Sequence, residues 1–110
     1  MENEKQQWVN ANQGDVCIVR LSKLPEGLIA ETCNEKIVAY GEVTGHKHLL
    51  RPVKGGVEFF NGNGLVYAQV EKEAELVHEE HETIIFPKGV YALGIQEEFD
   101  ILEGVRAVSD

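Results

Sequence analysis

The chain has few of the residues that cross-link or rigidify small proteins or form large core contacts. Its 110 residues include two cysteines, three prolines and one tryptophan. Cys17 lies in an apolar run typical of a buried strand, whereas Cys33 lies in a polar segment, so one disulfide is allowed but not required. No apolar stretch reaches the length that spans a bilayer, and no apolar targeting segment follows Met1. We therefore expect a cytoplasmic protein with reduced thiols.

Basic residues are also scarce. Ten lysines and arginines face nineteen aspartates and glutamates, which gives a formal net charge of −9. Such a surface repels phosphate backbones and anionic lipid head groups and attracts cations. We therefore expect no nucleic-acid partner and no membrane, and a protein partner or a second copy of the chain remains open.

Long helical patterns are absent too, and short β-branched runs take their place. Residues 16–21, 37–43 and 65–70 have the composition of strands, with turn residues between them. The strongest local signal is Asn61-Gly62-Asn63-Gly64, because Asn-Gly steps tolerate the positive φ of tight hairpins. The pattern predicts an all-β fold, a small antiparallel barrel or sandwich of about six to eight short strands with little helix.

The chain reads as one domain with an N-terminal extension. Residues 1–13 are mostly polar and are expected to form a flexible arm, followed by a single β domain over residues 14–110. Residues 70–81 fit a bent strand or a short helix. Residues 83–95 resemble a hairpin around Pro87-Lys88-Gly89.

All four histidines fall into two close pairs. His46 and His48 follow a predicted strand, and on a strand they would share one face with Cα atoms roughly 6.5–7 Å apart. His78 and His81 are three residues apart, which requires a bend or a helical turn for both to face one site. Neutral imidazoles converging in this way suit zinc, nickel or iron. The pairs therefore predict one four-histidine site for a divalent transition metal.

Carboxylates accompany both pairs. Glu42 precedes the first, and Glu79, Glu80 and Glu82 surround the second. We expect Glu42 or Glu80 to add a ligand or to orient a ring nitrogen from outside the ligand set. In the alternative interpretation, the histidines end strands and bond to backbone, and the histidine–glutamate cluster is solvated surface.

Three blocks of the chain resemble a known family when taken together. They are Gln13-Gly14-Asp15-Val16, Gly41-Glu42-Val43-Thr44-Gly45-His46-Lys47-His48, and the segment from His78-Glu79-Glu80-His81-Glu82 through Pro87-x-Gly89 to Gln96-Glu97-Glu98-Phe99. In this order they resemble small uncharacterised bacterial and phage-associated proteins with GEVTGH-x-H and HEEH segments. Gln96-Glu97-Glu98-Phe99 departs from the Gln-Arg-Glu-Tyr-type segment of that family. The resemblance implies no activity.

A looser similarity links the chain to cupins. His46-x-His48 and Pro87-x-Gly89 are similar to cupin metal-site features, but here the second histidine pair precedes the Pro-x-Gly turn. We treat this as an analogy. The sequence thus predicts a small β protein with a metal-binding histidine–glutamate cluster. The alternative is a non-enzymatic interaction or accessory module, phage-related through the resemblance, with structural histidines. No residue pattern selects a reaction or a catalytic residue, so whether the protein is an enzyme stays open.

Overall fold

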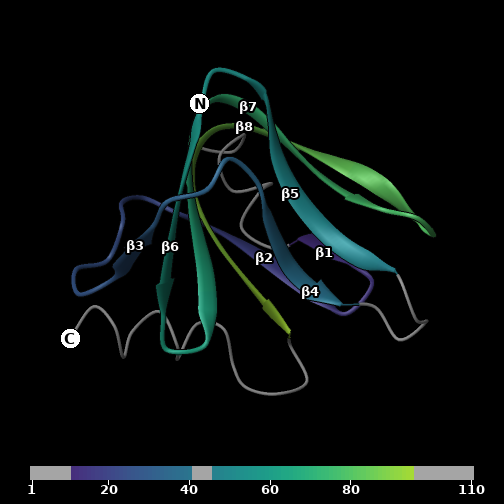
Figure 1. The fold of residues 1–110 in the computed structure, drawn as a ribbon, viewed down its shortest axis with the longest axis horizontal. Coiled ribbons are helices and arrows are strands. Elements are labelled where there is room, and N and C mark those ends of the chain that lie inside the picture. The colour runs from purple at the N-terminus through teal and green to yellow at the C-terminus, as the bar shows by residue number, and fades with distance from the viewer. Residues whose placement is uncertain (1–10, 41–45, 96–110) are drawn as a thin grey trace.

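The computed structural model describes residues 11–40 and 46–95, and within them the chain folds as one antiparallel sheet of eight strands (Figure 1). The strands are β1 Ala11–Gln13, β2 Val16–Leu21, β3 Ile29–Glu31, β4 Lys36–Tyr40, β5 Lys47–Lys54, β6 Val57–Gly62, β7 Leu65–His78 and β8 His81–Ile95. Among the described residues, no helix is long and apolar enough to cross a membrane. The predicted all-β class is confirmed.

The sheet curls into a half-barrel around the long β7–β8 hairpin (Figure 1). The strand order is β1-β2-β8-β7-β5-β4, and β6 pairs with both β7 and β3. On one edge of β7, the first half pairs with β6 and the second half with β5. On the other edge, the pairing with β8 has a register shift between Val70 and Glu73, where β7 changes neighbours. This irregularity bends the hairpin, because it increases the local twist of the ladder.

The two alternatives for residues 70–81 are now resolved, since β7 continues as a strand to His78. The hairpin expected at Pro87-Lys88-Gly89 was wrong, because β8 runs through all three residues. Gly89 adopts φ 158° where the hairpin bends. The Tyr91 hydroxyl donates to the Pro87 carbonyl at 2.7 Å and Arg20 Nη2 donates to the Lys88 carbonyl at 2.8 Å. Side chains thus hold the bend in a continuous strand, where composition alone indicated a turn.

The Asn-Gly hairpin prediction is confirmed. Asn63 and Gly64 form the two-residue connection between β6 and β7 with φ values of 53° and 81°. Positive φ at both positions is the mark of a type I′ turn, whose backbone twist matches that of the two strands it connects.

Alternating side chains build apolar clusters on both faces of the sheet. Along β2, Val16 and Ile18 enter the larger cluster, while Cys17 and Val19 enter the smaller one. The larger cluster fills the concave side of the curl and holds most of the largest buried side chains, including Tyr91, Phe59, Phe86, Leu50, Leu76 and Leu93. Cys17 is buried and Cys33 is half-buried, and the two do not form the optional disulfide.

The N-terminal boundary differs in one respect from the expected arm over residues 1–13. Ala11–Gln13 form β1, which pairs with β2 across a two-residue turn at Gly14 and Asp15. Gln13 is buried, with 2% of its surface exposed. Residues 1–10 of the expected arm lie outside the described residues.

Candidate metal centre

The histidines gather at one end of the half-barrel, where β5 begins and the β7–β8 hairpin turns (right in Figure 1). His48 and Leu50 lie two residues apart on β5, so they point to the same face, and both are buried. Leu50 belongs to the concave core. The cluster is therefore the polar end of that core.

The four imidazole rings form one group. The ring centroid of His78 lies 5.6 Å from that of His46, 4.3 Å from that of His48 and 4.6 Å from that of His81. His48 and His81 are nearly parallel, with centroids 5.9 Å apart. With metal–nitrogen bonds of about 2 Å, imidazoles on one ion have centroids roughly 5 Å apart. The two pairs that the sequence singled out thus meet in space.

A hairpin turn brings His78 and His81 together. They are register partners at the ends of β7 and β8, and Glu79 and Glu80 form the two-residue connection. The spacing of three therefore places them opposite each other across the hairpin, and no helical turn is involved. A register shift between Leu76 and His78 adjoins the turn.

Two glutamates of this turn approach the rings in different ways. One ligand atom each from His46, His78 and Glu79 lie within 4.8 Å of one another. Glu80 Oε2 lies 3.6 Å from His46 Nδ1, a buried atom with no hydrogen-bond partner among the described residues. Glu42, the other expected carboxylate, lies outside the described residues.

Glu79 is held in its charged form. Its Oε1 accepts a hydrogen bond from the Lys47 backbone N–H at 3.3 Å. Hydrogen bonds from its own N–H and that of Lys47, together with the charges of His46 and His78, lower the pKa of Glu79. A deprotonated carboxylate is the form that binds a cation.

His48 is the buried member of the group, with 4% of its surface exposed. Its Nδ1 lies 2.9 Å from Oε1 of Gln13. Burial, followed by the positive charges of His78 and His81, lowers the pKa of His48 from 6.5 to about 4. His48 is therefore neutral at physiological pH, as a metal-ligating imidazole must be.

The lowered pKa of His48 predicts loss of stability in mild acid. Between about pH 6.5 and 4 the unfolded chain protonates this ring and the folded chain does not, so metal-free protein loses stability as the pH falls through this window. Allowing for solvent screening, the loss is on the order of 1–2 kcal/mol. Urea unfolding of chelator-treated protein at pH 7, 5.5 and 4.5 measures it. In a His48→Gln variant, the free energy of unfolding should fall less between pH 7 and pH 4.5 than in the parent. An equal fall in that variant would show that His48 is not the group responsible.

His78 is engaged by its own turn. The Glu80 backbone N–H donates to His78 Nδ1 at 3.0 Å, so the neutral ring carries its proton on Nε2. A metal ion at Nδ1 would displace this hydrogen bond directly. An ion at Nε2 would move the proton to Nδ1 and break the same bond. Metal binding at His78 would therefore exchange one local hydrogen bond for a metal–nitrogen bond.

The β1–β2 turn forms the wall of the cluster beside His81. A Cβ atom on Gly14 would lie 2.7 Å from His81 Nε2, and Gly14 has φ +57°. Both the backbone conformation and the close ring therefore favour glycine at this position.

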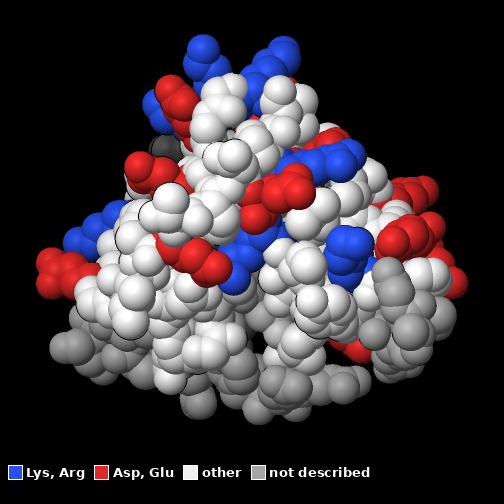
Figure 2. Space-filling model, viewed as in Figure 1, with Lys and Arg blue, Asp and Glu red and all other residues white. Residues whose placement is uncertain are grey.

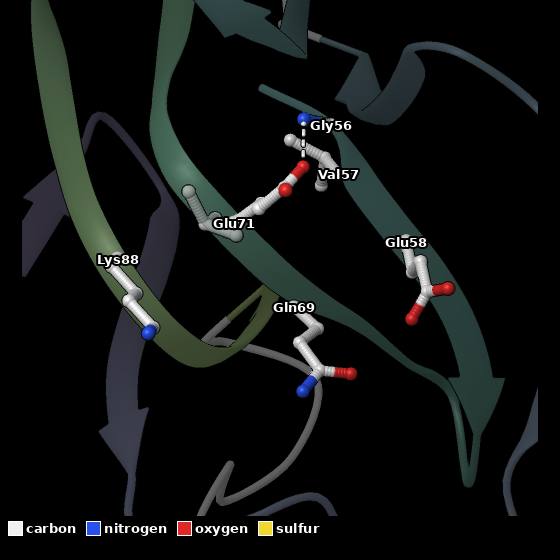
Figure 3. Close-up of a pocket in the computed structure, with 7 residues that line it drawn as sticks. Gly56, Val57, Glu58, Gln69, Glu71 and Lys88 are labelled. Atoms are coloured by element: carbon white, nitrogen blue, oxygen red, sulfur yellow. Dashed lines mark hydrogen bonds between the residues drawn. The ribbon is translucent and has the colours of Figure 1, made fainter. Parts of the chain in front are cut away.

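Two hollows on the surface differ in whether histidine and carboxylate side chains converge beside them. One of about 280 Å³ is lined by Lys47, Leu49, Val77, His78 and Glu79, so it opens directly beside the cluster. A larger one of about 560 Å³ lies along β6, β7 and β8 (Figure 3). There the Glu71 carboxylate accepts a hydrogen bond from the Gly56 N–H at 2.9 Å, and Figure 3 shows Glu58, Gln69 and Lys88 spread apart along the surface. Of these two hollows, the smaller one adjoins the cluster of His46, His78 and Glu79.

Charge is uneven around this end of the molecule. Figure 2 shows acidic side chains gathered on the right edge, at the end that carries the β7–β8 turn in this view. Glu79, Glu80 and Glu82 are exposed there. The surroundings of the histidines thus favour a cation.

Sequence reasoning placed all four histidines in one region but missed one close neighbour. Gln13 was assigned to the N-terminal arm, although it contacts His48 across 35 residues of sequence. Glu79, rather than Glu80, supplies the carboxylate in the tightest ligand group. No local pattern marks the contact of Gln13 with His48, and nothing local separates Glu79 from Glu80.

Comparison with known proteins identifies the family. No curated protein and no solved structure gives a significant match. A family model described as a domain of unknown function, DUF8820, matches residues 12–96, which include Gln13 and all four histidines. The protein belongs to the DUF8820 family.

Proposed function

We propose that the protein binds a divalent transition metal ion, such as zinc, nickel or iron, in its histidine cluster. The observation that carries the proposal is the convergence of His46, His78 and Glu79, with ligand atoms within 4.8 Å of one another. Ligand atoms on a single zinc ion are roughly 3–4 Å apart, so side-chain movements of about 1 Å would complete the set.

The chemistry of the group fits such an ion. Imidazole nitrogens with a carboxylate oxygen suit zinc and its neighbours in the transition series, whereas magnesium and calcium favour all-oxygen sites. The net charge of −9 and the exposed glutamates of the β7–β8 turn attract the cation.

The hollow beside His78 and Glu79 gives the proposed ion an exposed side. Its volume of about 280 Å³ accommodates water or a small ligand. A metal ion with an open position can activate water or polarise a bound group.

A second candidate function, a non-enzymatic interaction module, has separate support. Ile29 on β3 and Tyr40 on β4 are 71% and 73% exposed, and both strands lie at edges of the sheet. Exposed edge strands with large apolar side chains can pair with a partner chain. A pull-down that recovers one partner with the parent protein, and loses it with Tyr40→Ser, would support this function.

Metal binding is tested on protein without a histidine tag. Calorimetric titration with Zn²⁺ is expected to give about one ion per chain. At a free concentration 100 times the Kd, bound zinc should stabilise the fold by about 2.7 kcal/mol, which raises Tm by roughly 10 °C. Mg²⁺ is the control and should leave Tm unchanged. The absence of both binding heat and a Tm shift with Zn²⁺, Ni²⁺ and Co²⁺ would refute the proposal.

A further inference from the structure

The side chain of Gln13 makes three hydrogen bonds inside the protein, two through its amide nitrogen and one through its amide oxygen. Its Nε2 donates to the Leu76 carbonyl at 2.8 Å and to the Glu82 carbonyl at 2.9 Å. Carbonyl oxygens only accept, so the amide nitrogen must face these two groups. Oε1 of Gln13 therefore faces His48 Nδ1, and the orientation of the amide is fixed by its partners.

This orientation determines where His48 carries its proton. Because Oε1 of Gln13 can only accept, His48 Nδ1 must donate, at 2.9 Å. The neutral ring then carries its lone pair on Nε2. His78, whose ring centroid lies 4.3 Å away, has the opposite arrangement, since its Nδ1 accepts from the Glu80 N–H. Neighbouring rings are thus held in different tautomers by different partners.

Metal-ligating histidines almost always donate their second ring N–H to an outer partner, which fixes the ring and its tautomer. His48 has such a partner before any ion binds, and its ring already lies against His78 and His81. We propose that Gln13 is a positioning residue that holds His48 in the Nδ1–H tautomer, and that His48 ligates the metal through Nε2. This inference rests on the proposed function.

The position of Gln13 in the fold gives the inference a structural basis. Gln13 ends β1, and Gly14, the next residue, packs against His81. The β1–β2 hairpin therefore contacts two of the four rings. The two hydrogen bonds that the Gln13 amide donates connect this hairpin to β7 and β8, near the register shift between Leu76 and His78. Gln13 is thus fixed from three sides while it faces His48.

The test compares two variants of Gln13. Both lose the paired hydrogen bonds to the Leu76 and Glu82 carbonyls, but only one keeps an acceptor for His48 Nδ1. Gln13→Met has similar length and makes no hydrogen bond. Gln13→Glu cannot donate to both carbonyls, but its carboxylate still accepts from His48 Nδ1. We expect both variants to have a lower Tm. Zinc affinity, measured by competition with a chromophoric chelator, should fall about 10–100-fold in Gln13→Met and stay within about threefold of the parent in Gln13→Glu.

A second measurement does not depend on either variant folding. Long-range ¹H–¹⁵N correlation spectra of the metal-free parent protein should show His48 as the Nδ1–H tautomer. The Nε2–H tautomer for His48 would overturn the inference, as would equal losses of zinc affinity in Gln13→Met and Gln13→Glu. A parent protein that binds no zinc would instead refute the proposed function, and the inference with it. Unchanged affinity in Gln13→Met, with zinc still bound by the parent, would refute the inference alone.

Discussion

Replacing His78 by alanine is expected to lower zinc affinity by about 100-fold or more. His78 belongs to the tightest ligand group, and its ring lies against those of His46, His48 and His81. Its removal takes away a proposed ligand and also the ring that contacts the other three imidazoles. Competition titration with a chromophoric chelator measures the change.

His81→Ala provides the matched control. His81 is the exposed member of the cluster and lies outside the tightest ligand group. Its removal should lower zinc affinity less than about tenfold. An equal or larger loss in His81→Ala than in His78→Ala would contradict the ligand assignment. The Tm of each metal-free variant should be measured as well, so that an effect on folding is not taken for an effect on binding.

The second large effect concerns stability. Phe86→Ala is expected to destabilise the protein by about 3–4 kcal/mol, because it removes a fully buried aromatic side chain from the concave core. The Phe86 ring packs edge-on against Tyr91, with centroids 4.8 Å apart and planes at 86°. This loss is a large fraction of the 5–15 kcal/mol typical of a small domain. Chemical unfolding of the metal-free protein measures it.

Ile85→Ala is the control for this prediction. Ile85 is the preceding residue on β8, points to the opposite face and is 43% exposed. Its truncation should cost less than about 1 kcal/mol. If the two variants were destabilised equally, the assignment of the concave face as the main core would be wrong.

The fold class could be predicted because its signals are local. Strand runs such as residues 16–21 and the Asn63-Gly64 hairpin depend on residues close together in sequence. The expected hairpin at Pro87-Lys88-Gly89 failed because its residue types fit either a turn or a bend in a long strand. Contacts from Arg20 and Tyr91, which hold the bend, decide between them and come partly from another strand.

The candidate site could be predicted only in part. Same-face spacing was predicted for His46 and His48, but only His48 lies within β5, on the face of the buried Leu50, while His46 precedes the strand. The link between His78 and His81 is a Glu79-Glu80 hairpin turn, which lacks the Gly or Asn that would have marked it. The hydrogen bonds of Gln13 span 35 to 69 residues of sequence, so no local pattern could reveal them.

X-ray absorption spectroscopy of untagged protein loaded with one zinc ion per chain tests the central claim most directly. We predict four or five nitrogen and oxygen ligands at about 2.0–2.1 Å. The outer-shell scattering should show at least two imidazole rings, and three where His48 ligates together with His46 and His78. A shell of oxygen atoms alone, without imidazole scattering, would contradict a metal site built on these histidines.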